Sequence, residues 1–179
     1  MNICIDPGHG GRDSGAKIDT PFSYTEKQCN YEIALKLSER LQSNGHMVFL
    51  TREGDFYVDL DVRAQFANEA DVDVFVSIHA NAATNTAAQG MEIYHFMGST
   101  SSQQLAQITL DQMLHQCPGH LNRGVKTANY TVLRMTLMPA ILIETEFITN
   151  PQQAAFLRDV NSQNQLAEAI TTGIELFGN

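Results

Sequence analysis

The chain has 179 residues, of which 43% are hydrophobic and 17% are charged, as expected for one globular domain with a hydrophobic core. The formal net charge of −9 argues against binding to nucleic acid and against adhesion to anionic membranes or other anionic polymers. The cysteines Cys4, Cys29 and Cys117 lack close paired spacing, so we expect no disulfide framework, and the chain has no Cys-x-x-Cys metal motif.

Short apolar, β-branched runs that are typical of buried strands alternate along the chain with segments of helical periodicity. In chain order we predict a strand at 2–6, a helix at 26–44, a strand at 47–51, a helix at 59–70, strands at 73–78 and 91–96, a helix at 101–116, strands at 131–134 and 140–143, and helices at 152–157 and 164–177. This alternation predicts one α/β domain over residues 1–179, with a mostly parallel sheet of about six strands and helices on both faces. The run 140–143 is apolar throughout and should be a central strand.

The sequence shows no segment that predicts targeting or a membrane span. The apolar run from Met1 reaches Asp6 at once and is too short for a signal peptide. No stretch approaches the roughly 20 apolar residues that a membrane helix needs. We therefore expect a chain that stays in the cytoplasm, is exported by another route, or was excised from a longer protein.

Three reactive residues follow predicted strands at the point where each strand ends. His9 comes after the run 2–6 in a glycine-rich loop, His79 comes directly after 73–78, and Glu144 follows 140–143. In open α/β sheets, ligands and chemistry gather beyond the carboxyl ends of the strands. Two imidazoles and a carboxylate at one such edge predict a metal site with a base beside it.

Zinc enzymes usually use three protein ligands and leave one position for water, and two histidines with one glutamate form a known set. Glu26 opens the first predicted helix and can point back toward His9, although a carboxylate at a helix start is also stabilised by the helix dipole alone. Asp6, Asp13 and Asp19 are alternatives for the third ligand. The spacing of these residues does not decide between them.

Other charged residues allow more than one interpretation. Glu144 is suited to be a fourth ligand, a support for a ligand, or a general base. Glu146 would point the same way if the strand continued. Arg123 and Lys126 lie in a polar stretch that we expect to be a loop, either simply solvated or facing a carboxylate of a peptide substrate. His95, within a predicted strand, is the other histidine considered for substrate contact.

Several short motifs occur together and in order along nearly the whole chain. They are Asp6-Pro-Gly-His-Gly-Gly11 with Asp13-Ser-Gly-Ala16, Glu26-Lys27, Leu50-Thr-Arg52, Ser77-Ile-His-Ala-Asn81, Asn122-Arg-Gly-Val-Lys126, Val132-Leu-Arg134, Pro139-Ala-Ile-Leu-Ile-Glu144 and Phe147-Ile-Thr-Asn-Pro151. In these motifs the chain resembles the zinc-dependent N-acetylmuramoyl-L-alanine amidases, a family of bacterial cell-separation and sporulation amidases and some phage endolysins.

The resemblance implies that His9, Glu26 and His79 bind one Zn²⁺ and that Glu144 is the catalytic glutamate. It also implies that the substrate is peptidoglycan, cleaved at the cell wall between N-acetylmuramic acid and L-alanine. Asn81, Arg123 and Lys126 are then candidates for substrate binding. Glu146 departs from the family pattern, in which a glycine or another small residue is usual.

Some members of this family carry an extra helix before the catalytic glutamate that blocks the zinc until a partner removes it. Here the interval from His79 to Glu144 is filled by predicted strands, the polar stretch and one helix with a regular apolar face. We therefore expect no obligatory activator. Two other functions remain open: a different zinc amide hydrolase, such as a peptidase acting on cell-wall peptides, and a non-catalytic wall-binding domain.

Overall fold

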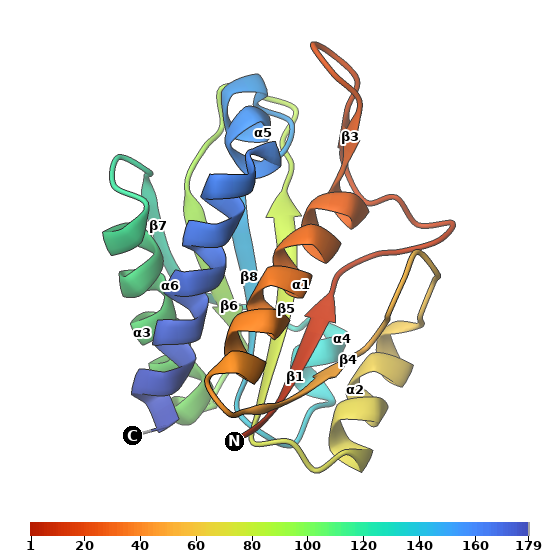
Figure 1. Cartoon of the computed structure of the whole chain (residues 1–179), viewed down its shortest axis with the longest axis vertical. Helices are drawn as coiled ribbons and strands as arrows, with labels where there is room; N and C mark the ends of the chain where they lie inside the picture. The colour runs from red at the N-terminus through yellow and green to blue at the C-terminus, as the bar shows by residue number, and fades with distance from the viewer. Residues whose placement is uncertain (179) are drawn as a thin grey trace.

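A computed structural model describes residues 1–178 of the chain. Its strands and helices alternate through most of the sequence (Figure 1). In chain order they are β1 Asn2–Pro7, β2 Lys17–Ile18, β3 Tyr24–Thr25, α1 Glu26–Ser43, β4 Met47–Leu50, α2 Leu60–Glu69, β5 Val74–Asn81, β6 Met91–His95, α3 Thr100–Gln116, β7 Asn122–Thr127, α4 Thr131–Arg134, β8 Ala140–Phe147, α5 Pro151–Arg158 and α6 Val160–Gly178.

The main sheet has six strands in the order β4-β1-β5-β8-β6-β7. Strands β4, β1, β5 and β8 are parallel, β6 is antiparallel to β8, and β7 is parallel to β6. The predicted class, an α/β domain with a mostly parallel sheet and β8 in a central position, is confirmed. Strands β2 and β3 form a separate small hairpin that the sequence analysis did not predict.

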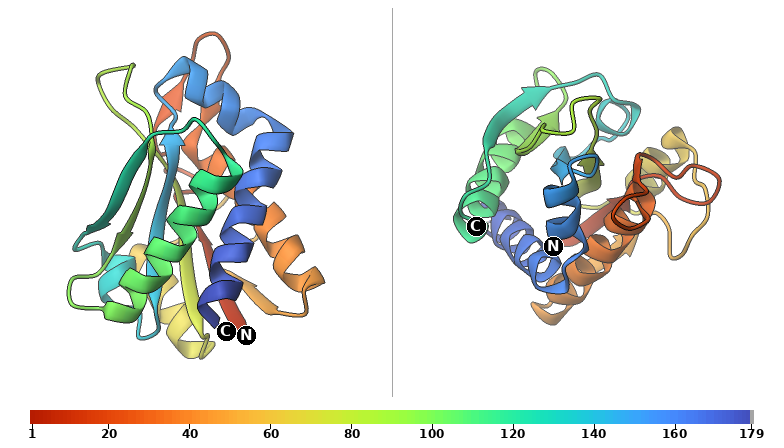
Figure 2. Two further views of the ribbon diagram at one scale, coloured as in Figure 1. Left: turned by 90° about the vertical axis from the view of Figure 1, so that its left-hand side faces the viewer. Right: turned by 90° about the horizontal axis from the view of Figure 1, so that it is seen from above.

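Helices cover the two faces of the sheet to different extents (Figure 2). We call the face that bears α1, α3 and α6 the covered face, where the buried stripe Ile33, Ala34, Leu37 and Leu41 of α1 joins a large hydrophobic cluster. We call the face that bears α2 and α4 the open face. Its cluster is much smaller and consists of Cys4, Ala67, Val72, Phe75, Val132, Leu133, Ala140 and Leu142.

Two predicted elements were wrong. The segment Thr131–Arg134 was predicted as a strand because Thr and Val favour strands, but it is helix α4, whose Val132 and Leu133 are buried in the open-face cluster. The polar stretch with Arg123 and Lys126 was predicted as a loop, but it is strand β7. An edge strand that pairs on one side only needs few apolar residues, so its pattern is weak.

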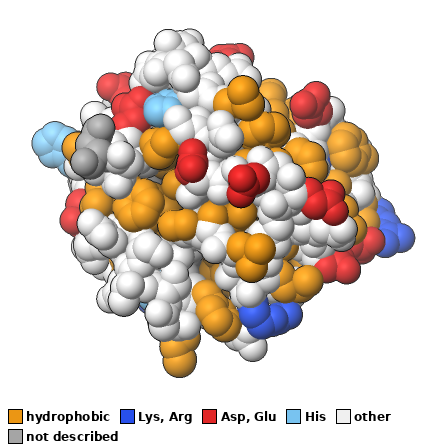
Figure 3. Space-filling view, turned by 90° about the horizontal axis from the view of Figure 1, so that it is seen from below, with side chains coloured by type: hydrophobic (Ala, Val, Ile, Leu, Met, Phe, Trp, Pro, Cys, Tyr) orange, Lys and Arg blue, Asp and Glu red, His pale blue; other side chains and the backbone are white. Residues whose placement is uncertain are grey.

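The N-terminus and the end of α6 lie at the amino end of the parallel strands (Figure 1). A space-filling view of this end shows hydrophobic side chains interspersed with polar and acidic ones, in keeping with the net negative charge (Figure 3). The cysteines Cys4, Cys29 and Cys117 are all buried and free. Among the helices of residues 1–178, none combines the length and apolar character needed to cross a bilayer.

Candidate active site

His9 lies in the loop that follows β1, at the carboxyl end of the parallel strands. Its φ of 61° is in the left-handed region, and hydrogen bonds between the backbones of Gly10 and Asp13 close the turn. A Cβ atom on Gly8 would lie 2.3 Å from the imidazole of His79. Glycine at this position therefore allows the two histidine-bearing segments to approach each other.

Glu26 is the first residue of α1 and points back toward the loop that carries His9. The small β2–β3 hairpin returns the chain to this loop, where the Glu26 backbone N–H donates to Ala16 O at 2.8 Å. The Ala16 N–H in turn donates to Glu26 Oε2 at 2.9 Å. This contact leaves Glu26 Oε1 directed at both histidines.

The structure brings His9, Glu26 and His79 together. His9 Nε2 lies 3.0 Å and His79 Nδ1 lies 2.9 Å from Glu26 Oε1, and the three candidate ligand atoms all lie within 4.8 Å of one another. Two imidazoles and a carboxylate are a donor set that suits zinc. Asp13 Oδ2 lies 2.8 Å from His9 Nδ1 and orients the ring, as carboxylates do for metal-bound histidines. The residues present therefore fit a metal centre.

Burial and the neighbouring groups act in opposite directions on the pKa values of Glu26 and His9. Burial alone would raise the pKa of Glu26, but hydrogen bonds from His79 and His9 outweigh it and lower the pKa. Burial would lower the pKa of His9, but Glu26 and Asp13 outweigh that effect and raise it. Glu26 is thus ionised, which is the state that a metal ligand requires.

The structure separates Glu26 from the aspartates that the sequence left as alternatives. Asp6 is buried and pairs with an arginine, Asp13 contacts His9 from behind, and Asp19 lies in a surface ion pair. Each aspartate therefore has a role or position other than that of third ligand in the cluster.

Two buried arginines, whose part in the site the sequence analysis did not identify, hold the loop that carries His9. Arg63 Nη1 donates to Asp6 Oδ1 at 2.8 Å and to Pro7 O at 2.9 Å, and its Nη2 donates to His9 O at 2.8 Å. Arg52 Nε donates to Pro7 O at 2.9 Å. Burial would raise the pKa of Asp6, but Arg63 and two hydroxyl donors outweigh it and lower the pKa. The inward helical spacing of Arg63 was the signal available in the sequence.

Glu144 lies near the carboxyl end of β8, in register with His79 on β5 and with Glu92 on β6. Laterally paired residues project from the same face, so the three side chains share the open face. Glu144 Oε2 is buried and has no hydrogen-bond partner within the described part of the chain. Burial raises the pKa of Glu144 well above its usual value, and the charges of Glu26 and Glu92 raise it further. A carboxylate in this state is a candidate proton acceptor.

Glu146 does not point the same way as Glu144, so the expectation based on regular alternation was wrong. The register between β5 and β8 shifts between His79 and Asn81, which places an extra residue in β8. Such a bulge re-aims the side chains that follow it. The fully buried Glu146 carboxylate instead lies 2.9 Å from His120 Nδ1, whose ring contacts α5.

Arg123 and Lys126 project from β7 and both pair with Glu92, which the sequence analysis did not identify. Arg123 Nε and Lys126 Nζ donate to Glu92 Oε2 at 2.7 and 2.5 Å, and Asn81 Nδ2 donates to Glu92 Oε1 at 2.7 Å. Burial would raise the pKa of Glu92, but the two cations outweigh it and lower the pKa. A charged residue inside an apolar predicted strand was the signal that could have found this carboxylate.

The candidate ligands and Glu144 line one cavity of about 600 Å³ on the open face. Its walls include Tyr57, from the segment before α2, and Tyr130, from the segment before α4. Asn81 also lines this cavity, whereas the two basic residues of β7 are not among its lining residues. The volume lies within the range of about 300–1,000 Å³ that is usual for small-molecule sites.

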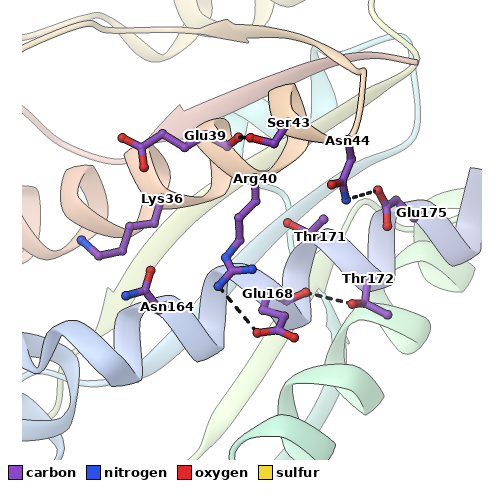
Figure 4. Close-up of a pocket in the computed structure, with 10 residues that line it drawn as sticks. All are labelled: Lys36, Glu39, Arg40, Ser43, Asn44, Asn164, Glu168, Thr171, Thr172 and Glu175. Carbon is purple, nitrogen blue, oxygen red and sulfur yellow. Dashed lines mark hydrogen bonds and ion pairs between the residues drawn. The ribbon is translucent and has the colours of Figure 1, made fainter.

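A second groove, of about 520 Å³, lies between α1 and α6 (Figure 4). Its lining is entirely polar or charged, and side chains pair across it, Arg40 with Glu168 at 3.6 Å and Asn44 with Glu175 at 2.7 Å. His95 lines neither cavity, because it is buried in β6 and bonds the backbone of the next residue. The reactive groups therefore gather on the open face.

Comparison with known sequences agrees with the motifs. A family model described as N-acetylmuramoyl-L-alanine amidase matches residues 3–176. The probable cell wall amidase LytH of Staphylococcus epidermidis is 36% identical over 175 residues, which make up 98% of this chain and 57% of that protein. The chain thus spans a little over half the length of this relative.

Solved structures of similar proteins share the whole fold. An N-acetylmuramoyl-L-alanine amidase from Clostridium difficile 630 has a TM-score of 0.95 and 37% identity, over 98% of this chain and 95% of that chain. The CwlD amidase from Clostridioides difficile, solved in complex with the GerS lipoprotein, has a TM-score of 0.92 and 30% identity, over 98% and 97% of the two chains.

Proposed function

The chain belongs to the N-acetylmuramoyl-L-alanine amidase family, and we propose that it is a zinc-dependent hydrolase of peptidoglycan at the cell wall. The bond cleaved is the amide between the lactyl group of N-acetylmuramic acid and L-alanine of the stem peptide. The observation that carries this proposal is the convergence of His9, Glu26, His79 and Glu144 on one cavity.

Each of these residues has a defined part in the proposed reaction. His9, Glu26 and His79 would hold the ion, and Asp13 would keep the His9 ring oriented. Zinc in such a site lowers the pKa of a water molecule toward about 7 and polarises the amide carbonyl. Glu144 accepts the proton of the attacking water and passes it to the departing amine of L-alanine.

We propose that Arg123 and Lys126 receive carboxylates of the stem peptide. Two cations around the single carboxylate of Glu92 leave a positive charge, and both basic side chains are about one third exposed. Asn81 helps to fix Glu92 from the cavity side. Charge-assisted hydrogen bonds to an acidic peptide suit such a group.

We propose further that the chain acts without an activator. Helix α3, which fills much of the interval between His79 and Glu144, buries Leu105 and Leu110 in the covered-face cluster and does not line the cavity. The apolar face of this helix is turned to the sheet, where α3 contacts β6, β7 and β8. Activity of the isolated chain, compared with and without candidate lipoprotein partners, tests the independence from activators.

The decisive experiment is mass spectrometry of purified sacculi digested with the chain, with and without a chelator. We expect stem peptides with a free L-alanine amino group, no product after chelation, and recovery when zinc is added back. Cleavage between amino acids of the stem would show a peptidase. Sacculi that bind the chain but release nothing would show a wall-binding domain, and either result would contradict the proposal.

A further inference from the structure

We propose that the open-face cavity contains a saccharide subsite between Tyr57 and Tyr130, which binds the neutral N-acetylated sugar next to the scissile amide. This inference rests on the proposed amidase function and assigns the sugar and the stem peptide to different sides of Glu144. Both tyrosines line the same cavity as Glu144, and they are 38% and 42% exposed. Half-exposed aromatic rings in a cavity are available to a ligand.

Tyr57 is held in its position by contacts with the loop that carries His9. Asp55 accepts a hydrogen bond from Gly11 N at 2.8 Å and pairs with Lys27 Nζ at 2.7 Å. A Cβ atom on Gly11 would lie 2.6 Å from Tyr57 N. Glycine at position 11 therefore allows the loop that carries His9 to contact the segment that carries Tyr57. The Arg12 guanidinium lies 4.3 Å from the centre of the Tyr57 ring. These contacts therefore fix the position of the Tyr57 ring in the wall of the cavity.

Tyr130 is held in the cavity wall by a different element. It directly precedes α4, and its ring makes an edge contact with Tyr94, with centroids 5.4 Å apart. Burial and then the charges of Glu144 and Glu92 raise the pKa of Tyr130, so its hydroxyl lies within electrostatic reach of both carboxylates. Tyr130 therefore lines the cavity and also contacts Tyr94, whose hydroxyl donates to Glu92 Oε1 at 2.8 Å.

The charges of the lining favour a neutral sugar over an acidic peptide. Arg63 and Asp6 in the lining pair with each other, which leaves the acidic Asp13, Glu26 and Glu144. Carboxylates repel the carboxylates of a stem peptide but accept hydrogen bonds from sugar hydroxyls. Aromatic rings offer flat apolar faces on which the C–H groups of a pyranose ring stack. The cations Arg123 and Lys126 lie outside this lining and suit the peptide.

The first test is titration of zinc-loaded protein with the peptide-free disaccharide of N-acetylglucosamine and N-acetylmuramic acid, followed by calorimetry or NMR. The lactyl carboxylate of this probe is blocked as the primary amide, so that the probe is neutral, as the sugar is in the substrate, and offers no carboxylate to the zinc. Tyr57→Ala and Tyr130→Ala should each weaken binding about tenfold, the scale of one lost aromatic contact. Tyr57→Phe, which keeps the ring, should bind much more tightly than Tyr57→Ala. Phe66→Ala is the matched control, because Phe66 is equally exposed at 38% but lies outside the cavity lining. Unchanged binding in both alanine variants, or no binding by the wild-type chain, would overturn the subsite.

The second test compares two substrates with the same scissile amide, a muramyl peptide and the corresponding lactoyl peptide without the sugar. Tyr57→Ala should reduce the ratio of kcat/KM for the muramyl over the lactoyl substrate about tenfold, mainly through KM. Phe66→Ala should keep the wild-type ratio. An equal loss on both substrates would show that the ring serves the peptide or the fold. If the wild-type chain cleaves neither substrate, the proposed function fails, while the disaccharide titration still decides the subsite.

Discussion

The covered and open faces of the sheet differ in how much apolar surface they bury and in what their side chains do. On the covered face, α1, α3 and α6 bury one large apolar cluster along the strands. On the open face, α2 and α4 bury a small cluster around Phe75 and Leu142, and His79 and Glu144 lie farther along the same strands, toward their carboxyl ends. Hydrophobic stability is concentrated on one face, and the space left by short helices on the other becomes the reactive cavity.

The strongest test of this division removes a candidate ligand from the open face. His79→Ala should lose bound zinc and activity together, while the covered-face core keeps the fold. Elemental analysis and circular dichroism measure the two effects. His115→Ala is the matched control, because His115 is exposed at the end of α3. A His79→Ala protein that retains stoichiometric zinc would refute the ligand assignment.

Glu144 and Glu146, near the end of β8, point to different faces of the sheet, so their substitution should affect different properties. Glu144→Gln should keep the fold and zinc while lowering kcat about 100-fold or more, the scale of a lost general base. Glu146→Gln should leave kcat near the wild-type value and lower the melting temperature instead, because it disturbs a buried pair with His120. An inactive Glu146→Gln with an active Glu144→Gln would show that the catalytic carboxylate is misassigned.

Buried charge on the open face should matter for stability as well as for the site. Asp6→Asn leaves Arg63 buried without its carboxylate and should cost about 3–5 kcal/mol of unfolding free energy. The pKa of Asp6 is lowered in the folded state, so its contribution is present above the unfolded value of about 3.9 and is lost as pH falls through the folded pKa. Urea unfolding at pH 7 should therefore separate the variant widely from the wild type.

Below about pH 4 the same urea curves should begin to converge. The gap should close as the pH falls through the lowered pKa of folded Asp6, where the protonated carboxyl no longer pairs with Arg63. Asp19→Asn, which removes a surface carboxylate paired at 3.0 Å with Lys17, is the control and should shift the curve little at either pH. A constant gap between wild type and Asp6→Asn at all pH values would contradict the ion-pair argument.

Adjacent positions in β8 separate packing from function. Ile141 is fully buried in the covered-face cluster, so Ile141→Ala should cost about 2–5 kcal/mol of unfolding free energy without changing KM. Leu142 lines the cavity, so Leu142→Ala should cost less stability and raise KM. Urea unfolding and steady-state kinetics measure both. An unchanged KM in Leu142→Ala would place the substrate elsewhere.

The smallest expected effect is a change in KM on substitution of Lys126, which lies on β7 outside the cavity lining. Lys126→Ala should raise KM for a stem peptide with free carboxylates by up to about tenfold and leave kcat unchanged, because Arg123 still pairs with Glu92. The effect should vanish on a peptide whose carboxylates are amidated. The same KM increase on both peptides would show that Lys126 supports Glu92 and does not contact the substrate.

Local patterns in the sequence were enough to predict the class of fold and the edge at which chemistry gathers. Apolar β-branched runs form buried strands wherever they occur, and parallel strands present their carboxyl ends together. His9, His79 and Glu144 follow from this rule because each comes at the end of such a run. The choice of Glu26 came from the family resemblance, since the spacing alone left three aspartates open.

The tertiary structure decided what depends on contacts between distant segments. The β2–β3 hairpin aims Glu26 at the histidines, one bulge turns Glu146 away from Glu144, and β7 is a strand only because it pairs with β6. Helix α4 forms where strand-favouring residues meet the open-face cluster. The periodicity of a segment does not predict these outcomes. The free energies of strand register, of a bulge and of pairing on one side depend on the partner strand as well as on the segment itself.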